Sequence, residues 1–140
     1  RKIYVSDALA NETATTELSM GLEYITEKNP TGGTSQGKFI TREVILAQPS
    51  TSLHITTAMT TPYGTGLELW YRAGMGSLST TAWTQKTIDM VQTNNSSQFY
   101  DNVIEINNIP EFTRFQCKFV FTSTSHFNSG IKDLRIIALL

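Results

Sequence analysis

Apolar and polar residues alternate along several short stretches of the chain, which is the two-residue period of strands with one buried face. The clearest stretch is residues 66–73, where Pro62 and Gly64 precede the alternation and Gly74 follows it. One set of alternate side chains in this stretch is apolar or aromatic and consists of Leu67, Leu69 and Tyr71. The residues between them are Glu68, Trp70 and Arg72. The pattern predicts a strand that buries the first set.

Similar periods and short apolar runs between turn-forming residues predict further strands. They are residues 2–5, 38–46, 53–59, 88–91, 99–106, 112–122 and 131–140. The polar triplet 41–43 predicts a bulge or bend inside 38–46. The final residues of the last strand are apolar on both parities, so we expect this strand to be sandwiched between other elements or covered on both faces.

The N-terminal part has a different character. Residues 17–26 are expected to form a strand or an extended arm, with Leu18, Met20, Leu22 and Tyr24 on one parity. The turn-forming run 29–37 is either a linker or a long surface loop. We therefore divide the chain into residues 1–36, an arm with the first strands and loop, and residues 37–140, a β-sandwich, the two together forming one domain.

About eight strands without any βαβ alternation predict an all-β fold, an antiparallel β-sandwich of jelly-roll type. The length of 140 residues suits one domain. The single cysteine, Cys117, excludes an internal disulfide, and its parity within 115–121 places it in the core. Because the chain begins at Arg1 without a signal-peptide pattern, we expect a processed product or an excised domain.

Composition excludes several classes of partner. The net charge of -1 gives no basic surface for nucleic acid or for an anionic membrane. No apolar run reaches the roughly 20 residues that a membrane span needs, so we expect no membrane insertion.

The sequence predicts no enzyme, cofactor or metal site. His54 and His126 lie in different elements, and no Gly-x-Ser-x-Gly motif occurs. Several acidic residues could include a carboxylate pair, although the sequence cannot place them: Glu68, Asp89, Asp101, Glu105 and Asp133. A loop calcium near Asp101 and Asn102 is the alternative for a metal, but no Asp-x-Asp-x-Asp-Gly run supports it.

Sugar binding has a physical basis on the predicted strand 66–73. If the apolar set faces the core, Trp70 lies on the outer face between Glu68 and Arg72, where a ring could stack on a sugar and the charged groups could bind hydroxyls. Tyr63 and Tyr100, both near turns, are further candidate contacts, as is Phe127 in a polar loop. The competing interpretation, which we prefer, is that Trp70 packs beneath a loop, the N-terminal arm or a neighbouring subunit.

The order of several segments resembles a C-terminal domain of tailed-bacteriophage virion proteins, over residues 23–140. The matching segments are the loop 29–35, the strands 38–47, 53–59 and 64–72, Trp83, the spaced residues Phe112, Phe115 and Lys118, and the closing run 131–138. The resemblance implies a galactose-binding-like jelly roll in the phage tail or baseplate, with no defined catalytic residues. At the position of Trp70 this family usually carries Tyr or another residue smaller than Trp, so Trp70 departs from the family pattern.

We therefore expect a non-catalytic tail or baseplate structural or host-attachment domain, located in the virion. The alternative is a carbohydrate-binding module that recognises a host-surface glycan through Trp70, Glu68 and Arg72. Other virion subunits are the expected partners, with homo-oligomers formed when the arm 1–28 adds a strand to a neighbouring sheet. The apolar end 136–140 is a second expected contact with a virion protein.

Overall fold

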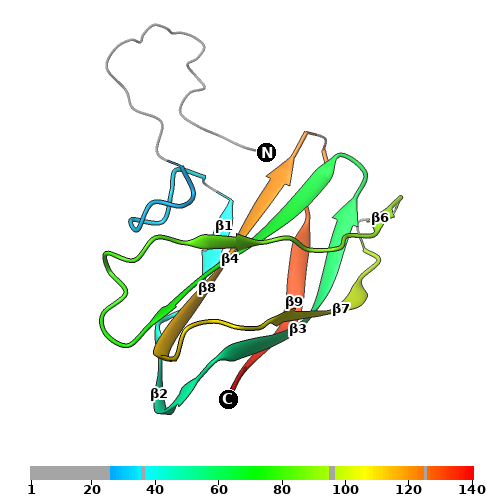
Figure 1. The fold of residues 1–140 in the computed structure, drawn as a ribbon. Helices are drawn as coiled ribbons and strands as arrows, with labels where there is room; N and C mark the ends of the chain where they lie inside the picture. The colour runs from blue at the N-terminus through cyan, green and yellow to red at the C-terminus, as the bar shows by residue number, and fades with distance from the viewer. Residues whose placement is uncertain (1–25, 36, 95–96, 125) are drawn as a thin grey trace, which may run out of the picture.

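The computed structural model describes residues 26–35, 37–94, 97–124 and 126–140, which form two β-sheets packed face to face (Figure 1). Sheet I contains β1 (Lys38–Ile40), β2 (Val44–Ser50), β4 (Thr65–Gly74), β5 (Thr84–Lys86) and β8 (Phe112–Ser123). Sheet II contains β3 (Ser52–Pro62), β6 (Gln92–Thr93), β7 (Tyr100–Ile106) and β9 (Gly130–Leu139). The predicted all-β sandwich is confirmed, while its jelly-roll type stays a prediction.

Strand β8 is the centre of sheet I. It pairs antiparallel with β4 from Thr65↔Ser123 to Gly74↔Arg114, and β5 follows on the far side of β4. Both β1 and β2 pair with the other side of β8. In the part of the chain that the structure describes, the sheet therefore ends at β5 on one side and at β1 and β2 on the other.

Strand β3 is the centre of sheet II. It lies between β9 and β7, both antiparallel to it, and its last residues also pair in parallel with β6. Among the described residues β9 pairs with β3 alone. The expectation that the last strand is covered on both faces is therefore wrong, because β9 is an edge strand whose Ile137 and Leu139 are exposed.

The core lies between the sheets and follows the predicted parities. Leu67 and Leu69 of β4 lie on the same face of sheet I as the odd-numbered residues of β8. The buried cluster consists of Leu53, Ile55, Met59, Leu67, Leu69, Ile88, Ile104, Ile106, Ile109, Phe112, Phe115, Cys117 and Phe119. Cys117 is a core residue, as predicted. Burial raises the pKa of its thiol to about 12, so the native thiol stays protonated near neutral pH.

The strand boundaries show which of the predicted strands and breaks the sequence pattern placed correctly. The predicted break at 41–43 is confirmed, because Thr41 separates β1 from β2 and exchanges hydrogen bonds with the backbone of Cys117. The brief strand predicted at 88–91 is wrong: Ile88 is buried but stands between β5 and β6. The strands predicted at 2–5 and 17–26 lie outside the described residues, apart from Thr26.

Candidate binding surfaces

The outer face of sheet I carries the predicted sugar platform. The register sets Trp70 opposite Lys118 and Arg72 opposite Gln116, so these side chains and Glu68 share the face that points away from sheet II. The predicted orientation of Glu68, Trp70 and Arg72 is therefore confirmed. The sequence left open what covers this face, and the structure places a second layer over it.

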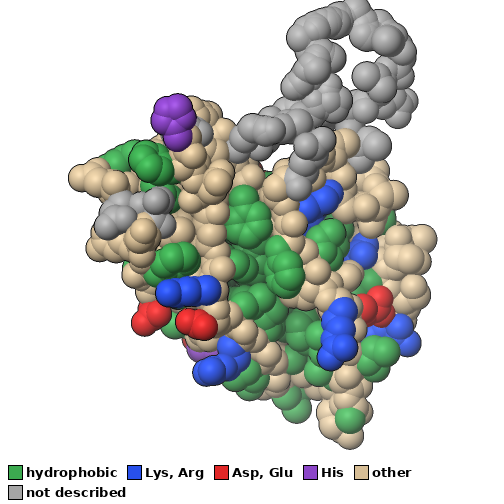
Figure 2. Space-filling model, turned by 180° about the vertical axis from the view of Figure 1, so that it is seen from behind, with side chains coloured by type: hydrophobic (Ala, Val, Ile, Leu, Met, Phe, Trp, Pro, Cys, Tyr) green, Lys and Arg blue, Asp and Glu red, His purple; other side chains and the backbone are tan. Residues whose placement is uncertain are grey.

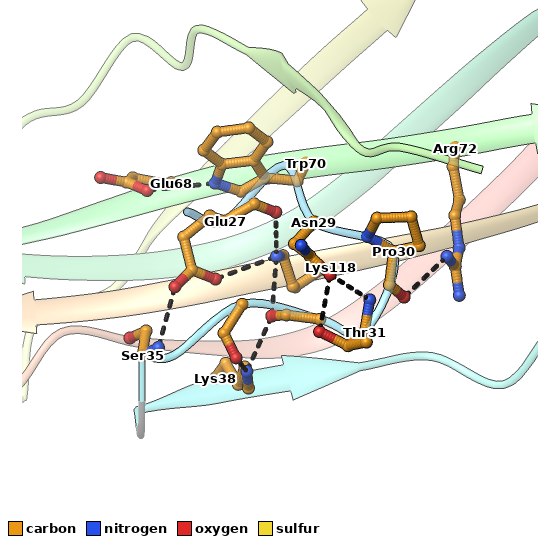
Figure 3. Close-up of polar contacts among 12 residues, drawn as sticks. Glu27, Asn29, Pro30, Thr31, Ser35, Lys38, Glu68, Trp70, Arg72 and Lys118 are labelled. Carbon is orange, nitrogen blue, oxygen red and sulfur yellow. Dashed lines mark hydrogen bonds and ion pairs between the residues drawn. The ribbon is translucent and has the colours of Figure 1, made fainter. Parts of the chain in front are cut away.

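Residues 26–35, which we call the strap, lie over this face (Figure 3). Trp83 joins the strap in that second layer. The Trp83 backbone N–H donates to the carbonyl of Lys28, and the Ser35 N–H donates to Glu27 Oε2 at 2.8 Å. Gly33 has a φ of 84°, and a Cβ there would collide with the Glu27 carboxylate. The run of turn-forming residues thus folds into a compact cover and does not extend as a linker.

Lys118 fastens the strap to the sheet. Its ammonium group donates to the Glu27 carbonyl at 2.7 Å, to Glu27 Oε1 at 2.9 Å and to the Gly32 carbonyl at 3.0 Å. Nζ also lies 5.3 Å from the ring centroid of Trp70 and 5.0 Å from that of Trp83. Burial lowers the pKa of Lys118, and the hydrogen bond and charge of Glu27 oppose that shift. All three donors of this ammonium group are used within the fold.

Trp70 is not the exposed ring that the platform hypothesis requires. Its side chain is 8% exposed and packs in one cluster with Trp83 and Val120. Its indole N–H donates to Glu68 Oε1 at 3.0 Å. The hypothesis of an exposed sugar platform at Trp70 is therefore wrong. The interpretation that we preferred, packing beneath a loop, is confirmed, because Trp83 from the β4–β5 loop packs with the ring.

Arg72 is also engaged inside the fold. Its Nε and Nη2 donate to Gln116 Oε1, and its Nη1 donates to the carbonyls of Pro30 and Thr81. The guanidinium stacks 4.3 Å from the ring centroid of Trp83. Burial lowers the pKa of Arg72. This side chain holds the strap and the Trp83 loop against β4, and it is not directed at an open surface.

The two predicted tyrosines lie apart from Trp70 and differ from each other. Tyr100 is half-buried, and its hydroxyl accepts a hydrogen bond from the Val91 N–H at 2.9 Å and bonds to Thr61 Oγ1 at 2.9 Å. Tyr100 therefore fixes local structure. Tyr63 is 60% exposed on the turn between β3 and β4.

Tyr63 belongs to a group of loops at one end of the sandwich, which we call the loop end. The Thr124 N–H donates to the Gly64 carbonyl at 2.7 Å, and Ser129 Oγ donates to the Gly66 carbonyl at 2.7 Å. These bonds join the β3–β4 turn and the start of β4 to the loop between β8 and β9. Phe127 in that loop is 45% exposed, so two aromatic rings stand on joined loops.

A broad apolar surface lies between β9 and the β1–β2 edge, of which the sequence indicated only the apolar end 136–140 as a contact. Phe39 pairs with Phe119 and so faces the interior side of sheet I, yet it is 47% exposed. Interior-facing side chains of both sheets are likewise only partly buried: Val44, Leu46, Phe121, Ile131, Leu134, Ile136 and Ala138. Figure 2 shows hydrophobic side chains gathered in a band down the middle of this side of the molecule. We call this band the apolar seam.

The described part of the chain has few other side chains that could act in catalysis or bind a metal. His54 Nδ1 lies 3.4 Å from Glu105 Oε2 on the outer face of sheet II, and His126 is exposed at the loop end. Among the described residues no three His, Cys, Asp or Glu side chains gather as a metal site would require. Nor do these residues include a helix with the length and apolar character to cross a membrane.

Comparison with known proteins adds no relative. No protein-family model, no curated protein and no solved structure matches the chain.

Proposed function

We propose that this domain is a non-catalytic structural or host-attachment module of a phage tail or baseplate, which acts by binding neighbouring subunits through its surface. The observation that carries the proposal is the apolar seam. Contiguous exposed apolar surface on a folded domain marks an interaction site, because leaving it in water is costly. Here the surface consists of side chains that lie on the interior-facing sides of the two sheets but are only partly buried there.

Two further features support an assembly role. Strands β9 and β1 border the seam and, among the described residues, each pairs on one side only, which suits the addition of a strand from another chain. The charged groups under the strap are engaged in holding the fold together, as the bonds of Lys118 and Arg72 show. The segment order that resembles phage virion domains suggests the tail or baseplate as the location and other virion subunits as partners.

A matched pair of phenylalanines tests the proposal. We expect the chain to self-associate and Phe39→Ser to weaken that association about 10- to 100-fold, since burying such a ring contributes about 1.5–3 kcal/mol. Phe127→Ser is the control, because Phe127 is about as exposed as Phe39 but lies at the loop end. Sedimentation equilibrium over a range of concentrations measures the association. A monomeric wild-type chain, or equal weakening by both variants, would contradict the proposal.

The loop end favours a second candidate function, a carbohydrate-binding module for a host-surface glycan. Exposed rings on adjoining loops can stack on the apolar face of a sugar, and Tyr63 and Phe127 stand on such loops. On this hypothesis Tyr63→Ala reduces binding to a glycan panel at least tenfold, while Phe39→Ser leaves it unchanged. Absence of saturable binding by the wild-type chain would exclude the candidate.

A further inference from the structure

We propose that the apolar seam is filled by residues 18–24 of a neighbouring copy of this chain, which add a strand along the free edge of β9. This inference rests on the proposed function, because it takes the seam to be an assembly surface. It goes further by naming the occupant and the way it binds.

The sheets differ in how far they extend at the seam. Sheet I continues past β8 to β1 and β2, whereas sheet II, as far as the structure describes it, ends at β9. The interior-facing ring of Phe39 consequently has no strand of sheet II described opposite it and remains 47% exposed. One more strand beyond β9 would lie over Phe39 and Phe121 and would complete the second layer.

The occupant must be an extended segment with apolar side chains on one face only. Residues 18–24 have that pattern, with Leu18, Met20, Leu22 and Tyr24 on one parity and Ser19, Gly21 and Glu23 on the other. Seven residues in a strand span about 23 Å, which fits along the ten residues of β9. The apolar parity would enter the seam, and Glu23 would share the outer face with Arg135.

The position of the strap favours a neighbouring copy over the same chain. Glu27 is bonded to Lys118 on the outer face of sheet I, so the strap lies across that sheet from the seam. Tyr24 is only two Cα steps from Thr26, a reach of about 7 Å. The seam lies between two sheets that pack about 10 Å apart, so reaching it from the outer face means passing around the whole of β1. This short reach favours the arm of another copy as the occupant of the seam.

Cross-linking between full-length copies tests this arrangement. Leu22→Cys chains are mixed with Phe39→Cys chains and treated with a short bismaleimide, and the control mixture pairs Leu22→Cys with Phe127→Cys. Native Cys117 is fully buried with a raised pKa, so it does not compete for the reagent. We expect at least tenfold more mixed dimer with Phe39→Cys than with Phe127→Cys. Equal yields would overturn the inference.

Two more variants separate this inference from the proposed function. The double variant Leu22→Cys/Phe39→Cys at high dilution should give little cross-linking within one chain, and efficient internal cross-linking would overturn the assignment to a neighbour. Leu22→Asp should weaken self-association as much as Phe39→Ser does. If only Phe39→Ser weakens it, the seam is an assembly surface with another occupant. If neither does, the proposed function also fails.

Discussion

Replacing Trp70 with alanine is expected to lower the free energy of unfolding by about 3–5 kcal/mol, the usual cost of removing a large aromatic side chain from a packed site. The ring is 8% exposed and packs against Trp83 and Val120, and its N–H bonds to Glu68. A cavity between β4 and the covering layer would remain in the variant. Urea denaturation followed by circular dichroism measures the change.

Tyr63→Ala is the matched control for that experiment. Tyr63 is an aromatic residue of the same domain but is 60% exposed on a turn, so its removal should change the free energy of unfolding by no more than about 0.5 kcal/mol. A similarly small effect for Trp70→Ala would show that packing of the outer layer against the ring contributes little to stability.

Replacing Lys118 with alanine is expected to cost about 3–5 kcal/mol of stability, because removal of one partner leaves the other buried charge uncompensated. The lysine side chain is fully buried and its partner, the Glu27 carboxylate, is 12% exposed. The Gly32 carbonyl would also lose one of its two hydrogen bonds and keep the one from Lys38 Nζ. The denaturation experiment used for Trp70 measures this effect, and Lys132→Ala on the exposed part of β9 is the surface control.

A double variant distinguishes lost charge pairing from lost packing. Lys118→Met keeps most of the side-chain volume, and combining it with Glu27→Gln removes both charges. We expect the double variant to be more stable than Lys118→Met alone by at least about 1 kcal/mol, since replacing both members of a buried pair is often nearly neutral. If the double variant is no more stable, the strap is held chiefly by contacts other than this ion pair.

The strands could be predicted because each is a local pattern. The alternation in residues 66–73 gave β4 nearly to its ends, and the odd parity around Cys117 gave the buried face of β8. The prediction at 88–91 failed because Ile88 is buried by tertiary packing without a strand partner. Apolar character alone does not separate those two cases.

The surfaces were harder to predict because they depend on distant segments. The sequence placed Trp70 on the correct face, but the ring packs with Trp83 of the next loop and with Lys118, which also fastens the strap some 40 residues earlier in the chain. Nothing near Trp70 in the sequence announces that contact. The seam could not be predicted either, because it arises where one sheet ends before the other. The only local signal was the apolar character of β9 on both parities.

The central position of β8 also bears on how the domain forms during translation. Strand β8 begins at Phe112, 38 residues after β4 ends at Gly74, yet it supplies the longest pairing that β4 makes. At roughly 5–20 residues per second the ribosome needs about 2–8 s to make that interval. During this time the edge of β4 that will pair with β8 is free, and an unpaired strand edge is prone to aggregation. The nascent chain is therefore expected to depend on late closure of sheet I, and to be most vulnerable just before β8 emerges.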